Sequence, residues 1–400
     1  MLDFTLPNLR FIPRLSIARL RPKKTVAAVA ALCLAFLSQS VVAGFSISGT
    51  QLLDGNGNPF IMRGINHPHA WYNYRTSSFA DIAATGANTI RVVLSDGQQF
   101  VRNSQEDVAR VIRRCKDNRL VCVLEVHDVT GSGEASSAGT LENATQYWID
   151  IAGALNGQED YVIINIANEP YGNGLPASTW VNGHKNAIQR LRAAGLTHTL
   201  MVDAANWGQD WQEIMLNNAT DVAGADALNN TMFSVHMYEV YQNRSKIESY
   251  ISRFLNTHSL PLIVGEFGAD HQGQNVDAES ILAVSEHYGI GYIGWSWSGN
   301  SGCCTALDIV INFDPNNLSP WGALLINSEN GIRATSVTAS VYSDTPPPQS
   351  DTRRCNWYGT IFPLCRYQDT GWGWEDMQSC VGIVDCENQY GDGGVVDCPP

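Results

Sequence analysis

The stretch Tyr161-Val-Ile-Ile-Asn-Ile-Ala-Asn-Glu169 is a run of mostly apolar residues that ends in two polar ones. A second stretch, Leu260-Pro-Leu-Ile-Val-Gly-Glu-Phe-Gly268, has the same form and carries Glu266 near its end. Continuous Val and Ile runs of this length are typical of strands buried on both faces, as in a parallel sheet that helices cover. Each stretch is therefore predicted to be a buried strand with a carboxylate at its carboxyl end.

Short apolar runs of this kind recur eight times between residues 44 and 344. They lie at residues 61–67, 88–94, 120–127, 161–169, 199–205, 232–238, 260–268 and 291–298. Helical, amphipathic stretches lie between them, for example at residues 105–118, 144–157, 179–194, 245–258 and 277–288. Eight β-α units in about 300 residues fit a closed (β/α)8 TIM barrel of the α/β class better than an open sheet. A doubly wound fold is the alternative, but no glycine-rich phosphate loop follows an early strand.

The first 43 residues have the pattern of a secretory signal peptide. An apolar run spans residues 25–37, and Val41-Val-Ala43 provides small residues before a cleavage site after Ala43. The run is preceded by a basic leader that contains Arg10, Arg14, Arg19, Arg21, Lys23 and Lys24. About 13 apolar residues fall short of the ~20 that a transmembrane helix needs. We therefore expect the leader to be removed and the protein to be secreted into the extracellular space.

The net charge of the chain bears on which macromolecules it can bind. The chain has a formal net charge of −14, and removal of the basic leader leaves −19. A chain this acidic repels nucleic acid and anionic membranes, so no nucleic acid or membrane partner is expected after signal removal. Because of this charge, a neutral polymer is the more natural partner.

The cysteine count is odd once the leader is removed. Ten cysteines minus Cys33 in the leader leave nine.

A proline-rich segment divides the chain. Residues 345–351 read Thr-Pro-Pro-Pro-Gln-Ser-Asp, which is typical of a short, semi-rigid linker. The predicted organisation is a signal peptide at 1–43, a catalytic domain at 44–344, a linker at 345–354, a binding module at 355–390 and a tail at 391–400.

Polar side chains gather where the predicted barrel strands end. They are Arg91, His127, Asn168, Glu169, His236, Tyr238, Glu266, Trp295 and Trp297. Any one of them alone is more easily explained as a helix cap, a structural hydrogen bond or a core residue. Their convergence on the carboxyl face of one barrel is hard to explain by packing, because buried polar groups are costly.

Two carboxylates in this set, Glu169 and Glu266, match the needs of glycoside hydrolysis. One carboxyl group protonates the leaving oxygen while the other acts as a nucleophile or as a base for water. A separation of about 5–5.5 Å would imply retention of configuration at the anomeric carbon. The histidines occur on separate strands without a metal-binding spacing, so neither a metal nor another cofactor is expected.

The motif Asn168-Glu169-Pro170 resembles the acid/base motif of glycoside hydrolase family five, in clan A. The stretch Ile263-Val-Gly-Glu-Phe-Gly268 resembles the nucleophile strand of that family. The resemblance implies that Glu169 is the general acid/base and that Glu266 is the nucleophile.

The same resemblance implies roles for the remaining residues. Asn168 would bind the sugar 2-hydroxyl, and His127 would line the subsite on the non-reducing side of the scissile bond. His236 and Tyr238 would orient the carboxylates, and Arg91 would keep the nucleophile ionised. Trp297 would be the stacking platform, with Trp295 as the other candidate.

The resemblance covers residues 44–344 and is closest to bacterial endo-β-1,4-mannanases, through stretches such as Gly64-Ile-Asn-His-Pro-His-Ala-Trp-Tyr72. It implies hydrolysis of internal bonds in β-mannan, glucomannan and galactomannan. Two alternatives remain open: an endo-β-1,4-glucanase on the same scaffold, and a non-catalytic carbohydrate-binding protein of the cell wall. Cys303-Cys304 departs from the family pattern and leaves the shape of the loop after the eighth strand open.

The C-terminal segment reads as a small module held by disulfides. Four cysteines within 32 residues (Cys355, Cys365, Cys380 and Cys386) allow three pairings, of which we favour the nested one, Cys355–Cys386 with Cys365–Cys380. Trp372 and Trp374 alternate as on one strand and therefore share a face. Elsewhere Cys115 and Cys122 are candidates for a further pair, and Cys398 is left without a partner.

The module resembles carbohydrate-binding module family ten, which binds cellulose. The resemblance implies that Tyr358, Trp372 and Trp374 are the binding aromatics and that cellulose is a partner. The alternative, that these aromatics form the small core of the module, stays open.

Overall fold

A computed structural model describes residues 44–343, 353–375, 378–389, 391 and 393–397. The expected signal peptide, most of the expected linker and Cys398 lie outside the described residues. Within them, no helix has the length and apolar character needed to cross a membrane.

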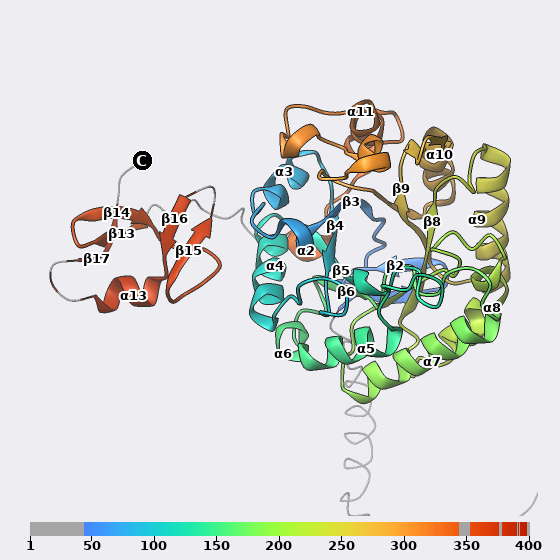
Figure 1. Cartoon of the computed structure of the whole chain (residues 1–400), viewed down its shortest axis with the longest axis horizontal. Coiled ribbons are helices and arrows are strands. Elements are labelled where there is room, and N and C mark those ends of the chain that lie inside the picture. The colour runs from blue at the N-terminus through green and yellow to red at the C-terminus, as the bar shows by residue number, and fades with distance from the viewer. Residues whose placement is uncertain (1–43, 344–352, 376–377, 390, 392, 398–400) are drawn as a thin grey trace, which may run out of the picture. The chain divides into compact units, whose positions relative to one another are not determined.

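Eight parallel strands close into a barrel (Figure 1). They are β3 (Arg63–His67), β4 (Thr89–Leu94), β5 (Val121–Val126), β6 (Val162–Asn165), β7 (Leu200–Asp203), β8 (Thr231–Met237), β9 (Leu262–Phe267) and β12 (Gly291–Gly294). Seven strands lie within one of the eight apolar runs, and β8 begins one residue before its run at 232–238. The last strand pairs with the first through Tyr292 and Arg63, so the sheet has no edge there and the doubly wound alternative is wrong.

Helices surround the barrel (Figure 1), and their buried apolar residues belong to one core cluster with those of the strands. They include α3 (Ser78–Ala84), α4 (Gln105–Asp117), α5 (Leu141–Asp150), α6 (Ala152–Leu155), α7 (Ala177–Ala193), α8 (Ile214–Ala223), α9 (Arg244–His258), α10 (Ala278–Tyr288) and α11 (Pro320–Asn327). In α4, Ser104 caps the amino end by accepting from the Asp107 N–H, and Val108, Val111, Ile112 and Cys115 are buried at helical spacing.

The barrel interior changes from apolar to polar along its axis. A cluster of buried residues that includes Val123, Ile163, Met201, Met232 and Ile263 fills the amino-terminal half. The hairpin of β1 (Ser46–Ser48) and β2 (Gln51–Leu53) adds Leu52 to this cluster. Glu125 follows Val123 by two residues on β5, and Asn165 follows Ile163 by two residues on β6. Residues two apart on a strand share a face, so both polar side chains point into the barrel. Functional groups therefore lie at the carboxyl end, as the sequence predicts.

A shift of register places two site residues side by side. Along β8 and β9, Val235 pairs with Val264, but His236 pairs with Glu266, so Gly265 is one extra residue on β9. A bulge of this kind redirects a side chain locally. It sets Glu266 opposite His236.

The C-terminal module is β-rich, as expected. It contains a sheet of β14 (Thr360–Pro363), β13 (Arg353–Trp357) and β17 (Gly394–Asp397), a pair β15 (Trp372–Glu375) and β16 (Gln378–Val381), and α13 (Ile383–Asn388). The sheet reaches beyond the expected bounds of 355–390 at both ends. Residues 394–397 were expected to be tail, but β17 pairs with β13 and Val395 packs against the core of the module.

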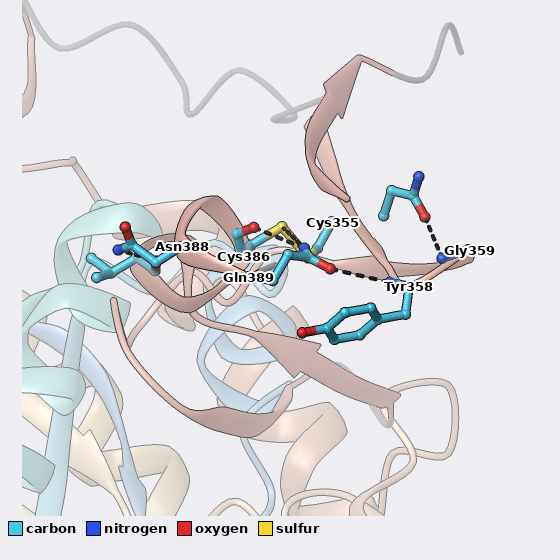
Figure 2. Close-up of a disulfide and its surroundings, with 8 residues drawn as sticks. Cys355, Tyr358, Gly359, Cys386, Asn388 and Gln389 are labelled. Atoms are coloured by element: carbon cyan, nitrogen blue, oxygen red, sulfur yellow. Dashed lines mark hydrogen bonds between the residues drawn. A yellow bond between two sulfur atoms is a disulfide. The ribbon is translucent and has the colours of Figure 1, made fainter. Parts of the chain in front are cut away.

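Two nested disulfides hold the module. Cys355 is bonded to Cys386, and Cys365 is bonded to Cys380. Figure 2 shows the first bond, beside which Gln389 donates to the Cys386 carbonyl oxygen (2.8 Å) and accepts from the Tyr358 N–H (3.1 Å). The bond and Gln389 together tie β13 and its turn to α13.

The third candidate disulfide is not formed. Cys115 and Cys122 are buried thiols with their Sγ atoms 2.7 Å apart. The end of α4 and the start of β5 bring the thiols into contact, but this separation exceeds the ~2.05 Å of a disulfide bond.

Candidate active site

The carboxyl ends of the barrel strands bring the predicted site residues to one cleft of about 640 Å³. Its lining includes His127, Asn168, Glu169, Tyr238, Glu266 and Trp295. Arg91 and His236 lie fully buried beneath it. Of the predicted barrel residues, Trp297 alone does not join this group.

Glu266 is held by two hydrogen bonds, one to each carboxylate oxygen. Arg91 donates from Nη1 to Oε1 over 2.6 Å, and the Tyr238 hydroxyl donates to Oε2 over 3.0 Å. Burial opposes the charge of Arg91, but Glu125, Glu266 and Asp203 more than offset it and raise the pKa of Arg91. Arg91 is therefore a permanent cation against Glu266, an arrangement that stabilises an ionised carboxylate.

Glu169 follows β6 and has a different environment. His236 Nδ1 lies 2.7 Å from Glu169 Oε1. Burial raises the pKa of Glu169, the hydrogen bond and charge of His236 lower it, and Glu266 raises it again; the net shift is upward. A carboxyl group with a raised pKa keeps its proton to higher pH, which suits a general acid.

The imidazole of His236 lies between the two carboxylates. Besides its contact with Glu169, Nδ1 lies 3.6 Å from Oε2 of Glu266. Burial opposes the positive charge of His236, but Glu266 and Asp203 overcome it and raise the pKa of His236 to about 10.

The two carboxylates are close to one another. One oxygen of Glu169, one nitrogen of His236 and one oxygen of Glu266 all lie within 4.8 Å of one another. This short spacing agrees with the separation in retaining glycosidases, about 5–5.5 Å, rather than with the ~6.5–9.5 Å of inverting ones. A metal ion needs a neutral imidazole, so a protonated His236 disfavours metal binding by these three groups.

Asn168 and His127 are positioned by buried partners. Asn168 Oδ1 accepts from Arg91 Nη2 (2.7 Å), and its Nδ2 donates to Thr130 Oγ1 (2.9 Å). His127 Nδ1 lies 3.0 Å from Glu125 Oε1. Burial opposes protonation of His127, but Glu125 overcomes it and raises the pKa of His127.

Trp295, rather than Trp297, is the tryptophan that lines the cleft. The Trp295 ring lines the cleft and stacks on His127, with ring centroids 5.5 Å apart. Trp297 is fully buried in the core, so its prediction as the stacking platform is wrong. Strand alternation would place both rings on one face, but β12 ends at Gly294, before either residue.

Several site residues were missed by sequence reasoning. Asp203, Glu125, Asn66 and Asn165 contact the Arg91 guanidinium from four strands. Asp203 ends β7 as Glu169 follows β6, and that pattern could have identified it. Trp207 and Trp211 also line the cleft; loop tryptophans carry no distinguishing signal.

The cleft extends along the loops after β6 and β7. Trp207 Nε1 donates to Glu134 Oε2, and Trp211 Nε1 donates to Asn173 Oδ1, both over 2.7 Å. The Trp211 side chain is 53% exposed. Indole rings fixed through their N–H groups and open to solvent are suited to stack on sugar rings.

The aromatic residues of the C-terminal module are exposed. The exposed fractions are 61% for Tyr358, 48% for Trp372 and 56% for Trp374. The buried core of the module consists of Cys355, Val381 and Cys386 instead. The alternative that the three aromatics form the core is therefore wrong, and they provide an apolar surface.

Comparison with known proteins finds two separate matching segments in the chain. Residues 53–301 match the cellulase model of glycosyl hydrolase family 5, and residues 354–382 match a family described as a cellulose or protein binding domain. A mannan endo-1,4-β-mannosidase of Cellvibrio japonicus is 54% identical over 366 residues, which cover 90% of this chain and 85% of that protein. A mannan endo-1,4-β-mannosidase of Streptomyces lividans is 45% identical over 351 residues, 86% of this chain and 90% of that protein.

The fold agrees with a solved structure of the same kind. The mannohexaose complex of a Thermomonospora fusca β-mannanase superposes with a TM-score of 0.73 at 52% identity, covering 75% of this chain and 99% of that one. With its closed eight-stranded barrel and its paired carboxylates, the chain belongs to glycoside hydrolase family 5 and carries a C-terminal module of carbohydrate-binding family 10.

Proposed function

We propose that the chain is a retaining endo-β-1,4-mannanase, which hydrolyses internal bonds of β-mannan, glucomannan and galactomannan by double displacement. The observation that carries the proposal is the pair Glu169 and Glu266, whose oxygens lie within 4.8 Å of one another in one cleft but have different partners, His236 for Glu169 and Arg91 with Tyr238 for Glu266. The mannan substrate is supported by the 54% identical relative, named for that activity, and by the relative whose complex holds mannohexaose.

In the first step, the ionised Glu266 attacks the anomeric carbon of the sugar at the cleavage site. Glu169 gives its proton to the glycosidic oxygen, so the bond to the leaving chain breaks as the bond to Glu266 Oε forms. Arg91 and Tyr238 hold the Glu266 carboxylate in place for this attack. The product is a covalent glycosyl-enzyme and a free chain end.

In the second step, Glu169 is ionised and takes a proton from water. The resulting hydroxide attacks the anomeric carbon and releases Glu266, so two inversions give net retention. His236 lies within 3.6 Å of both carboxylates and stabilises the negative charge that alternates between them.

Two alternatives to the mannanase are a non-catalytic binding protein and an endoglucanase. A non-catalytic binding protein has no need of two neighbouring buried carboxylates, since burying them costs free energy. An endoglucanase shares this scaffold, and mannose differs from glucose only in the axial position of the 2-hydroxyl.

The test is reducing-sugar release by the purified enzyme on pure β-mannan, glucomannan and carboxymethyl-cellulose in parallel. Strong release from both mannans with little from the cellulose derivative supports the proposal. Release from glucomannan and the cellulose derivative without release from pure mannan would favour the endoglucanase. No release from any of them would favour the binding protein.

We further propose that the protein is secreted and that its module binds cellulose through Tyr358, Trp372 and Trp374. The exposed aromatic surface suits the flat apolar faces of β-linked glucose. Trp374→Ala should weaken adsorption to crystalline cellulose and leave hydrolysis of soluble mannan unchanged. Ile361→Ala removes a similarly exposed side chain (51%) and serves as control. Equal loss of adsorption in both variants would contradict the aromatic site.

A further inference from the structure

Asp203 is a third carboxylate beneath the cleft. It ends β7, is fully buried and does not line the cleft, so substrate does not reach it. A buried carboxylate needs charged or hydrogen-bonding partners, and the partners of Asp203 are those of the catalytic pair.

Both oxygens of Asp203 have partners. Oδ2 makes an ion-pair contact of 3.3 Å with His236 Nε2, without hydrogen-bond geometry, and accepts from Arg91 Nη2 over 3.3 Å. The same oxygen accepts from the backbone N–H of Glu169 over 3.2 Å. Oδ1 accepts from Asn165 Nδ2 over 2.9 Å. Asp203 thus contacts Arg91, the partner of Glu266, and His236, the partner of Glu169. It also binds the backbone of Glu169 itself.

The His236 ring has little freedom to turn away from this partner. A Cβ at Gly208 would lie 2.7 Å from His236 Cγ and Nδ1, and a Cβ at Gly265 would lie 3.3 Å from Nε2. Both glycines therefore lie close to the ring, and Ser234 Oγ lies beside Gly265. The charged groups around the ring are Glu169 and Glu266 at Nδ1 and Asp203 at Nε2.

From this geometry we infer that Asp203 is a positioning residue for the acid/base step, acting on Glu169 through the His236 ring and the Glu169 backbone N–H. Its charge holds the second ring proton on Nε2, so that Nδ1–H donates to the Glu169 carboxylate. The inference rests on the proposed function, because it assigns Asp203 to the residue that protonates the leaving group.

The charge of Asp203 is stable over the working range of pH. Burial opposes ionisation of Asp203, but His236 and Arg91 overcome it and lower the pKa of Asp203 to about 2. Asp203 also contributes to the raised pKa of His236, after Glu266. Neutralising Asp203 should therefore let His236 lose a proton at lower pH.

The test combines Asp203→Asn with two substrates that differ in their need for an acid. Hydrolysis of mannohexaose needs protonation of the leaving oxygen, whereas a 2,4-dinitrophenyl β-mannobioside does not. General acid catalysis contributes on the order of 10²–10⁴-fold. We expect kcat/KM on mannohexaose to fall on the order of 10²-fold and kcat/KM on the aryl glycoside to change by about threefold or less. Equal losses on both substrates would overturn the inference.

Asp210→Asn is the matched control. Asp210 is also a buried carboxylate, in the loop after β7, but it accepts from Tyr250 and from the backbone of Met215 and Leu216 rather than from site residues. It should leave the ratio between the two substrates unchanged. The same shift in ratio in both variants would mean a general structural effect and would overturn the inference.

Nitrogen NMR of His236 provides a readout that does not depend on activity. In the wild type both ring nitrogens should stay protonated through neutral pH, and in Asp203→Asn the ring should titrate at lower pH. If Asp203→Asn does not fold, Glu266→Gln replaces it: with Glu266 neutral, Asp203 should still keep His236 protonated at pH 7. A neutral ring in that variant would overturn the inference. Because this readout needs no turnover, failure of the mannanase proposal and failure of the role of Asp203 are distinguishable.

Discussion

Arg91 and Glu266 form a hydrogen-bonded ion pair of 2.6 Å in which the Arg91 side chain is fully buried and that of Glu266 is 5% exposed. Arg91 also donates to Asn66, Asn165 and Asn168, so one guanidinium joins the nucleophile to the polar floor of the barrel. The pair therefore serves both catalysis and stability.

Arg91→Leu should destabilise the barrel as well as inactivate it. Removing one partner of a buried ion pair leaves an uncompensated charge, at a cost of about 3–5 kcal/mol. The free energy of unfolding from urea titration should fall by about this amount relative to the wild type. A change under about 1 kcal/mol would show that the pair does not contribute to the barrel in this way.

Glu266→Ala should abolish hydrolysis and keep polysaccharide binding. Loss of a covalent nucleophile typically lowers kcat by several orders of magnitude, on the order of 10⁴-fold or more. Binding of mannohexaose by calorimetry should persist, because the aromatic residues of the cleft are untouched. An active Glu266→Ala enzyme would remove Glu266 from the nucleophile role.

The pH profile should report the raised pKa of Glu169. Activity requires the protonated acid, so it is present below the pKa of Glu169 and is lost as pH rises through it. Because burial and Glu266 raise this pKa, the basic limb of kcat/KM should lie above the ordinary glutamic acid value of 4.5. In Glu169→Ala, the basic limb should disappear for an aryl mannoside with a good leaving group. A limb at the same pH in that variant would assign it to another group.

Trp295→Ala and Trp297→Ala should separate binding from stability. Trp295 lines the cleft, so its loss should raise KM on mannohexaose by about fivefold, in line with ~1 kcal/mol for ring stacking. Trp297 is fully buried in the core, so its loss should cost about 3–5 kcal/mol of unfolding free energy. The reverse pattern in kinetics and urea titration would restore Trp297 as the platform.

The fold could be predicted because each barrel strand is a buried apolar run ended by polar residues. That pattern depends on local sequence alone, and it also located Glu169, Glu266 and His236, whereas Arg91 lies inside β4. The presence of disulfides among the four module cysteines was likewise accessible, since a small module needs such bonds; the nested pairing was a choice among three.

Other features depend on contacts between distant parts of the chain. The choice of Trp295 over Trp297 depends on β12 ending at Gly294. The role of Asp203 depends on its distance from His236, and the pairing of His236 with Glu266 depends on one extra residue in β9. The sequence placed the end of the module at residue 390 and so left out β17, because β17 is recognisable only through its pairing with β13, about 40 residues earlier.

The most direct test of the account is proton NMR of the reducing-end anomer released from mannohexaose in the first minutes of hydrolysis. Carboxyl groups within 4.8 Å and a covalent intermediate on Glu266 predict that the β-anomer appears first and then mutarotates to the α-anomer. Initial release of the α-anomer would contradict the double displacement, and no release would contradict the mannanase proposal itself.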